Sequence, residues 1–158
     1  MPYEESTLNL KKFIVFEIAD EEFAIPVEKV GAIERLESIT RVPQTEKFVK
    51  GVINLRGVVI PVIDLRTRFG LETKSYDEST RIIIIHLDET EVGLIVDQAN
   101  DVIDISEDSI EPAPEVVDEI DIDYISGVIK IDKRLLIMID LHRVLSIENP
   151  SEYTNTEG

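Results

Sequence analysis

Two aspartates, Asp64 and Asp140, occupy the same place in two similar stretches, each within the tripeptide Ile-Asp-Leu. A duplicated β protein with one such carboxylate in each half can pair them across a pseudo-twofold axis for acid–base catalysis. Such a dyad needs open, glycine-flanked loops, whereas both aspartates here are followed by leucine and by a helical period. We therefore expect each carboxylate to cap the first turn of a short helix. A carboxylate-dyad hydrolase is the alternative.

The other polar residues show no catalytic or metal-binding pattern. His86 and His142 are not part of a metal-binding histidine motif, and no serine lies in a nucleophile elbow. The chain has no cysteine, which excludes thiolate metal sites and cysteine nucleophiles. The stretch 104–123 holds nine carboxylates and no basic residue, but from Asp118 it lacks the glycine and the glutamate of a calcium loop. We expect a solvated acidic loop there, and no metal, cofactor or enzymatic activity.

Composition limits the partners. The 158 residues are 43% hydrophobic and 31% charged, which is typical of a globular protein with a real core. With 16 Lys and Arg against 33 Asp and Glu, the formal net charge of −17 repels phosphate backbones and anionic membranes. No apolar run approaches the roughly 20 residues of a membrane helix, and the N-terminus does not resemble a signal peptide. We expect a soluble, cytoplasmic protein with no nucleic-acid partner and no direct membrane insertion.

The elements that position these residues are short strands arranged in an internal repeat. Two hairpin patterns, FIVFEIADEEFAIPVEKV and RIIIIHLDETEVGLIVD, align when shifted by 69 residues, so that Phe16 matches Ile85 and Phe23 matches Val92. A shift of 76 residues superposes two further stretches, GVINLRGVVIPVIDL from Gly51 and GVIKIDKRLLIMIDL from Gly127. The order of hairpin, spacer, GVI corner and IDL ending predicts repeats over approximately 13–80 and 81–147.

This repeat predicts a mainly all-β fold. Each unit supplies about four or five short strands, which are too few for a large sheet but enough for a small barrel, so we expect two small barrels packed together. Each unit ends in a short helix, DLRTRFG and DLHRVLS, and Gly70 is well placed to end the first one. The polar ends, 1–12 and 148–158, are expected to be flexible tails.

The corner NLRG carries a single arginine, Arg56, between Leu55 and Gly57. A guanidinium on such a loop is hard to bury and easy to present, and it can donate several hydrogen bonds to a carboxylate or to carbonyls at a helix end. The alternatives are an ordinary solvent-exposed turn residue and an intramolecular ion pair. In the second repeat the matching residue is Asp132, so the two corners carry opposite charges and need not bind the same partner.

Four stretches of the chain resemble the CheW family, the adaptor of bacterial chemotaxis: FxxFEIxxExFAIPVEKV, KFVKGVINLRGVVIPVIDLRTRFG, EVGLIVDQANDVIDI and ISGVIKIDKRLLIMIDLHRVL. The resemblance runs from about Phe13 to Ser146, and its most specific element is the NLRG corner followed by PVIDL. It implies one CheW-like domain over 13–147, made of two five-stranded SH3-like β-barrels around a shared hydrophobic core.

The resemblance also implies a non-enzymatic function. One surface would bind the regulatory domain of the histidine kinase CheA and another the cytoplasmic tip of a methyl-accepting chemoreceptor, which brings kinase autophosphorylation under receptor control. The protein would then be cytoplasmic and associated with membrane receptor arrays through its partners. Because CheV contains the same module, a CheV-like or stand-alone scaffold with different partners is an alternative.

In CheW proteins the receptor groove lies between the two barrels. The residues that match its positions here are Ile14, Val27, Val30, Ile33, Ala99 and Arg56. Because Val27, Val30 and Ile33 are spaced by three, a straight strand would not place them on one face, so we expect the chain to bend near Gly31. For each aliphatic residue, ordinary barrel core is the alternative. The resemblance does not identify the kinase contacts, and we interpret the apolar strand from Val96 to Ile105 as core rather than as an exposed edge.

Overall fold

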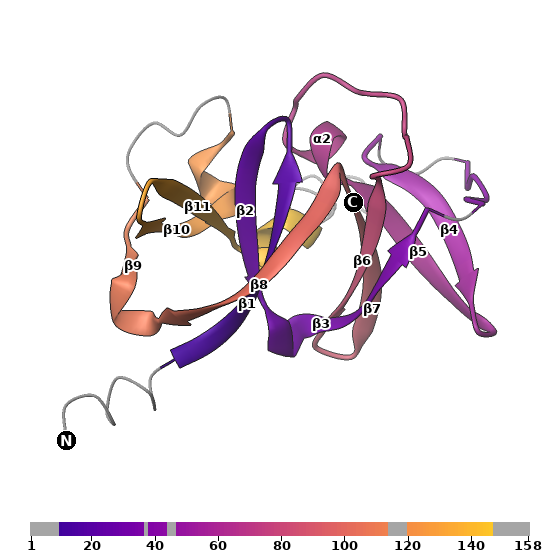
Figure 1. Cartoon of the computed structure of the whole chain (residues 1–158). Coiled ribbons are helices and arrows are strands. Elements are labelled where there is room, and N and C mark those ends of the chain that lie inside the picture. The colour runs from indigo at the N-terminus through magenta and orange to yellow at the C-terminus, as the bar shows by residue number, and fades with distance from the viewer. Residues whose placement is uncertain (1–9, 37, 44–46, 114–119, 147–158) are drawn as a thin grey trace, which may run out of the picture.

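The computed structural model describes residues 10–36, 38–43, 47–113 and 120–146, and within them the fold is mainly β. One sheet has six strands in the order β8-β1-β2-β11-β10-β9, and the other has five in the order β3-β6-β7-β5-β4 (Figure 1). The six-stranded sheet contains β1 (Leu10–Ile18), β2 (Glu21–Pro26), β8 (Gln98–Ser106), β9 (Ile110–Glu111), β10 (Ile125–Ile131) and β11 (Arg134–Ile139). The five-stranded sheet contains β3 (Val30–Arg35), β4 (Val49–Leu55), β5 (Val58–Asp64), β6 (Arg81–Leu87) and β7 (Thr90–Val96).

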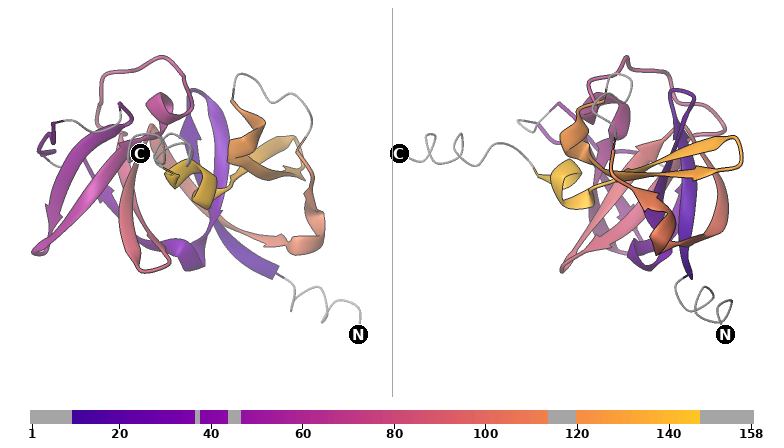
Figure 2. Two further views of the ribbon diagram at one scale, coloured as in Figure 1. Left: turned by 180° about the vertical axis from the view of Figure 1, so that it is seen from behind. Right: turned by 90° about the vertical axis from the view of Figure 1, so that its left-hand side faces the viewer.

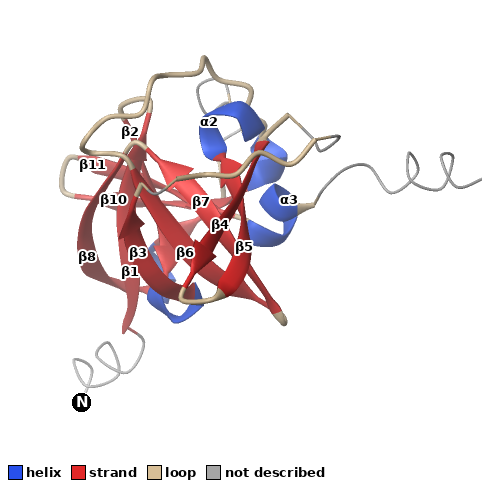
Figure 3. Cartoon of the chain, turned by 90° about the vertical axis from the view of Figure 1, so that its right-hand side faces the viewer, coloured by secondary structure: helices blue, strands red, loops and turns tan. Residues whose placement is uncertain are grey.

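Short helices connect the strands. Two α-helices, α2 (Leu65–Arg68) and α3 (Leu141–Leu145), follow β5 and β11, and Figure 3 shows both beside the sheets. Three single-turn 3-10 helices are η1 (Val27–Lys29), η2 (Glu107–Ser109) and η3 (Ile122–Tyr124).

The strands of the two repeats are exchanged between the sheets. The six-stranded sheet takes β1 and β2 from the first repeat and its other four strands from the second, while the five-stranded sheet takes β3, β4 and β5 from the first and β6 and β7 from the second. Both parallel pairs, β2 with β11 and β5 with β7, join strands of different repeats. The predicted mainly β fold with two β subdomains is confirmed, but each subdomain combines strands of both repeats, so the expectation that each repeat supplies its own barrel was wrong.

In the exchanged arrangement, strands β1 and β6 are buried on both faces. In β6, Ile82 and Ile84 pack into a cluster inside the five-stranded sheet, whereas Ile83 and Ile85 pack into a cluster shared by both sheets. Strand β1 does the same for the six-stranded sheet, with Phe13 and other odd-numbered residues in the inner cluster and the even-numbered ones in the shared cluster. Such continuous apolar runs need a packed layer on each side. The left-hand view of Figure 2 shows the two sheets side by side.

The predicted helix caps are confirmed. The Asp64 carboxylate accepts hydrogen bonds from the backbone N–H of Arg66 (2.8 Å) and of Thr67 (3.3 Å) at the start of α2. Asp140 accepts one from Arg143 N–H (3.2 Å) at the start of α3. Gly70 follows α2 with a φ of 78°, a conformation that glycine adopts without strain.

Two boundaries differ from the expectation. β1 begins at Leu10 and pairs with β8 from there, so residues 10–12 belong to a strand and not to a tail. The acidic stretch 104–123 is not a single loop, because it contains the end of β8, η2, β9 and part of η3. Residues 1–9 and 148–158, expected as tails, and 114–119 lie outside the described residues.

Within the described ranges, no helix is long and apolar enough to cross a membrane. The same residues contain no group of three or more histidines and carboxylates arranged to hold a metal ion.

Candidate functional site

The crossing from the first sheet to the second carries three of the predicted receptor-site residues. Val27 begins η1, and Val30 and Ile33 lie in β3, which pairs with β6. The predicted bend is confirmed, because η1 turns the chain and the β3–β6 register shifts around Gly31. This turn leaves the Ile33 side chain 40% exposed on the end strand of the sheet.

The remaining aliphatic residues lie in two different environments. Ile14 is only 6% exposed and belongs to the shared core, against which Val27 and Val30 also pack. Ala99 is half-buried in β8 opposite Phe16 and lies outside that core cluster. The structure thus brings Ile14, Val27 and Val30 into one cluster but not Ala99.

Strand β8 is an edge and not a core strand, contrary to the interpretation from sequence. In the described part of the chain it pairs only with β1, and the Val102 side chain is 53% exposed. The apolar pattern indicated a core strand because Val96 and Ile105, at the two ends of the run, are buried. Edge strands present unpaired backbone groups that a partner can bind.

Arg56 lies at the tip of the β4–β5 hairpin. Its φ of 54° and the φ of 87° at Gly57 form a tight two-residue turn, and the Asn54 side chain accepts a hydrogen bond from Gly57 N–H (2.9 Å). The Arg56 side chain is 78% exposed, and its Nη2 lies 3.9 Å from Oε2 of Glu34 in β3. Both sequence alternatives therefore hold in part: the arginine is an exposed turn residue, and it forms a long ion pair.

The Arg56 corner is also an apolar surface. Val58 and Val59, which follow the turn, are 50% and 63% exposed. The ion pair with Glu34 connects the corner to β3, and Ile33, which precedes Glu34 in this strand and points to its opposite face, is also exposed. A guanidinium among exposed aliphatic side chains can bind a partner that presents both a carboxylate and an apolar face.

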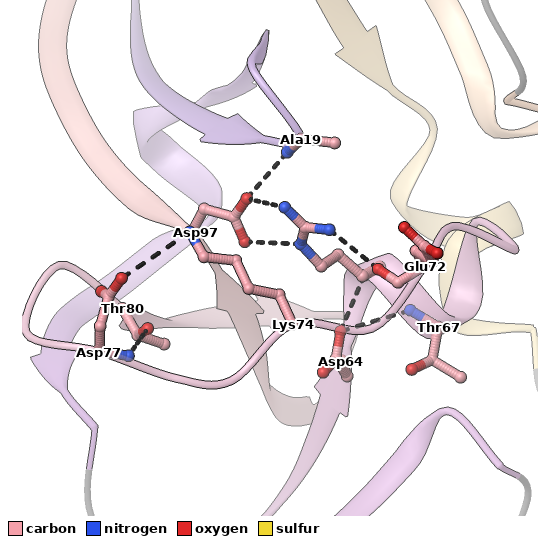
Figure 4. A network of polar contacts seen from close by, with 9 residues as sticks. Ala19, Asp64, Thr67, Glu72, Lys74, Asp77, Thr80 and Asp97 are labelled. Carbon is pink, nitrogen blue, oxygen red and sulfur yellow. Dashed lines mark hydrogen bonds and ion pairs between the residues drawn. The ribbon is translucent and has the colours of Figure 1, made fainter.

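A polar network that the sequence analysis missed is centred on Asp97, between β7 and β8. Its carboxylate accepts hydrogen bonds from Arg66 Nε (3.0 Å), from Arg66 Nη2 (2.7 Å) and from the backbone N–H of Ala19 (2.8 Å). Figure 4 shows the hydrogen bond between Asp97 and Ala19. Arg66 also donates to the Glu72 carbonyl (2.8 Å). Burial raises the pKa of Asp97, but the hydrogen bonds from Arg66 and Ala19 outweigh it and hold this pKa below its ordinary value.

This network fastens α2 to the β1–β2 turn and to the chain that leaves β7. The two charged side chains are only 16% and 18% exposed, so the bidentate pair is well shielded from water. Sequence offered one signal, because the repeat counterpart of Arg66 is His142, which indicates that the two halves differ at this position.

Arg68 connects the two halves of the molecule. Its Nε donates to the Val144 carbonyl (2.8 Å), and its Nη2 donates to the carbonyls of Arg143 and Ser146 at the end of α3. The guanidinium lies 4.2 Å from the centre of the Phe48 ring. A cation at a helix C-terminus complements the exposed carbonyls there.

Asp64 is fully engaged within the first half. Its Oδ1 accepts the two backbone N–H groups of α2, its Oδ2 accepts the Tyr76 hydroxyl (2.7 Å), and the residue is 3% exposed. Burial and this hydrogen bond raise the pKa of Tyr76. Asp64 and Asp140 cap different helices after strands of different sheets, which supports capping over a carboxylate dyad.

Comparison with known proteins agrees with this architecture. A family model described as "CheW-like domain" matches residues 12–149. Chemotaxis protein CheW of Bacillus subtilis (strain 168) is 48% identical over 139 residues, which are 88% of this chain and 89% of that protein. Chemotaxis protein CheW of Klebsiella aerogenes is 38% identical over 138 residues, 87% of this chain and 83% of that protein.

A solved structure is similar over the same range. The crystal structure of the scaffolding protein TtCheW from Thermoanaerobacter tengcongensis superposes with a TM-score of 0.81 at 40% identity, covering 87% of this chain and 89% of that one. The resemblance carried by the NLRG and PVIDL stretches is thereby confirmed. The chain belongs to the CheW-like family and is a non-catalytic adaptor of bacterial chemotaxis.

Proposed function

We propose that the protein couples transmembrane chemoreceptors to the histidine kinase CheA and brings kinase autophosphorylation under receptor control in a receptor–adaptor–kinase complex. The observation that carries the proposal is the exposed Arg56 corner, tied to the partly exposed strand β3 at the crossing between the sheets. Membership of the CheW-like family supports this coupling of receptor to kinase. The complex is cytoplasmic and associates with membrane receptor arrays through its partners.

The receptor side of the proposal has a physical basis. A chemoreceptor tip is a helical hairpin, and a helix that seats in a groove needs apolar anchors with a few polar fixings. We propose that Ile33 supplies an exposed anchor, that the half-buried Val27 and Val30 supply further apolar surface, and that Arg56 supplies the polar fixing. Ile14 is buried in the core cluster against which Val27 and Val30 pack.

The long contact between Arg56 and Glu34 leaves room for a better one. The two charged groups are 3.9 Å apart, whereas charge-assisted hydrogen bonds of arginine are typically about 2.7–2.9 Å long. A receptor carboxylate or helix-end carbonyl that approaches the corner can therefore replace Glu34 as the partner of the guanidinium, with little loss of interaction energy within the protein. Ala99, in edge strand β8 of the six-stranded sheet, is the proposed receptor contact on that sheet.

The test is the change of Arg56 to glutamate, with binding to a receptor-tip fragment measured by calorimetry. A charge-assisted contact is worth about 1.5–3 kcal/mol, so we expect affinity to fall roughly tenfold or more while the circular dichroism spectrum is unchanged. The matched control is Asp132→Lys at the corresponding corner of the second repeat, which we expect to bind the receptor fragment as the wild type does. Unchanged affinity of a folded Arg56→Glu protein removes Arg56 from the site.

The kinase side is tested with the isolated regulatory domain of CheA. We expect the protein to bind this domain directly. Because we propose separate surfaces for kinase and receptor, both Arg56→Glu and Asp132→Lys should retain this binding. A protein that binds receptor tips but not this domain would be a scaffold with different partners.

A further inference from the structure

An apolar pocket lies beside α3, at the open end of the β4–β5 hairpin and therefore at the opposite end of that hairpin from Arg56. Its volume is about 290 Å³. The floor is made of the buried side chains of Phe48, Ile63, Leu87 and Val92. Asp88 and Thr90, both exposed, stand at its mouth, so the pocket is reached from solvent.

The repeat supplies a filled version of the same place. Beside α2, near the end of the first repeat, Phe69 packs face to face with Phe23 (ring centres 5.7 Å apart) and against Tyr124 (5.6 Å). Phe69 is only 5% exposed and belongs to the shared core. The Phe69 ring occupies the space between the rings of Phe23 and Tyr124.

The three aromatic positions correspond to three residues of the pocket. Under the 69-residue shift Phe23 matches Val92, and under the 76-residue shift Phe69 matches Leu145 and Tyr124 matches Phe48. All three counterparts line the pocket. Two rings of the filled end are thus replaced by smaller aliphatic side chains on an equivalent backbone, and the missing volume is the pocket.

We propose that this pocket binds a phenylalanine side chain presented by a partner protein on a basic segment. The ring takes the place that Phe69 occupies at the other end, with Phe48 and Val92 on either side. The volume suffices, since a cavity of about 150 Å³ lined by aliphatic and aromatic groups is enough for benzene. Aromatic anchors that enter apolar pockets are the usual hot spots of protein interfaces.

The charge at the mouth selects the neighbours of that phenylalanine. Asp88 is 80% exposed at the rim, 3.7 Å from His142, and Glu89 beside it is also exposed, whereas Glu91 on β7 pairs with His86 (3.1 Å). Asp88 and Glu89 add to the field of a chain that carries a formal charge of −17. Lysine or arginine next to the anchor therefore favours docking, and acidic neighbours oppose it. The inference concerns a surface other than the Arg56 corner and does not rest on receptor or kinase coupling.

The experiment is a titration of the full chain, labelled at isoleucine, leucine and valine methyl groups, with the peptide acetyl-Lys-Phe-Lys-amide, observed by NMR. One anchor gives weak binding, with a Kd in the millimolar range. We expect ring-current shifts at the methyl groups of Ile63, Leu87, Val92 and Leu145. Methyl groups around the filled end, such as those of Ile125 and Ile139, are the internal control and should not shift.

Two comparisons make the result decisive. The peptide acetyl-Lys-Ala-Lys-amide should cause no pocket shifts, and Leu145→Phe, which places a ring in the pocket from within, should abolish the response to the phenylalanine peptide. Val92→Phe serves the same purpose if Leu145→Phe does not fold. Absence of pocket shifts at millimolar peptide, or equal shifts with the alanine peptide, would overturn the proposal. Pocket shifts that grow with protein concentration alone would assign the pocket to a second copy and would also overturn it.

Discussion

The C-terminal ends of the two repeats, which carry α2 and α3 and touch through Arg68, are equivalent in sequence position yet are built differently. At the α2 end, Phe69 fills the space between two rings, and Arg66 binds Asp97 in a shielded bidentate pair. At the α3 end an open pocket takes the place of the ring, and the counterpart of Arg66, His142, lies 3.7 Å from Asp88 with both side chains largely exposed.

The difference shows how a duplicated fold separates stability from binding. The backbone of each end is set by the same hairpin, corner and cap, but the α2 end has the buried ring of Phe69 and the shielded Arg66–Asp97 pair, whereas the α3 end has Leu145 and the exposed His142 at the matching positions. We infer that the α2 end contributes mainly to the stability of the fold, and that the α3 end, with its cavity and weak ion pair, is available to a partner. Four comparisons of matched variants test this division.

The largest expected effect is on packing. Phe69→Ala removes a buried ring from the aromatic cluster and should lower the free energy of unfolding by about 3–5 kcal/mol. Leu145→Ala, at the matching position, should cost about 1–2 kcal/mol, because Leu145 is half-buried and already borders a cavity. Urea denaturation measures both. Equal losses would mean that the two ends are packed alike.

The ion pairs should differ next. Arg66→Ala leaves the poorly exposed Asp97 carboxylate without its guanidinium, so the free energy of unfolding should fall by about 2–3 kcal/mol. His142→Ala removes an exposed contact and should change it by less than about 0.5 kcal/mol. A loss from His142→Ala as large as that from Arg66→Ala, measured in the same denaturation series, would contradict the division between the ends.

The helix caps offer a finer contrast. Asp64→Ala removes the acceptor for two backbone N–H groups and for the Tyr76 hydroxyl, whereas Asp140→Ala removes the acceptor for one described N–H group. We expect losses of about 2 kcal/mol and about 0.5–1 kcal/mol respectively. Thermal unfolding followed by circular dichroism compares them, and Tyr76→Phe separates the hydroxyl contribution from the cap. The reverse order of the two losses would show that Asp64 is not the stronger cap.

The smallest effect concerns pH. Because the pKa of Asp97 is lower in the folded protein than in the unfolded chain, its ion pair stabilises the fold above the unfolded pKa of about 3.9. This stabilisation is lost as the pH falls through the folded pKa. In acid titrations of the free energy of unfolding, Asp97→Asn should therefore lose part of the steep decline of the wild type, while Asp88→Asn should keep it. Identical profiles for the wild type and Asp97→Asn would show that Asp97 does not contribute to the loss of stability in acid.

Local features of this fold could be predicted from sequence because they depend on neighbouring residues. The hairpins follow from alternating apolar residues, the caps from aspartate before a helical period, and the bend before β3 from the spacing of Val27, Val30 and Ile33. The 76-residue repeat shift likewise aligns Phe69 with Leu145 from the amino-acid order alone.

The exchange of strands between sheets could not be predicted in this way. Periodicity indicates which face of β3 or β8 is apolar, but not whether the strand pairs with a hairpin of its own repeat or of the other one. The Arg66–Asp97 pair joins residues 31 positions apart through that exchanged arrangement, and Arg68 reaches residues 75 to 78 positions away. Contacts of this range depend on topology, which local patterns do not specify.

The most direct test of the adaptor function is CheA autophosphorylation in the presence of receptor-tip fragments, measured without added protein, with this protein and with its Arg56→Glu variant. Coupling predicts that the wild-type protein makes the kinase rate depend on the receptor fragments and that the folded variant loses this dependence. A kinase rate that is the same with and without the wild-type protein, at concentrations where it binds both partners, would contradict the proposal that the protein couples receptor to kinase.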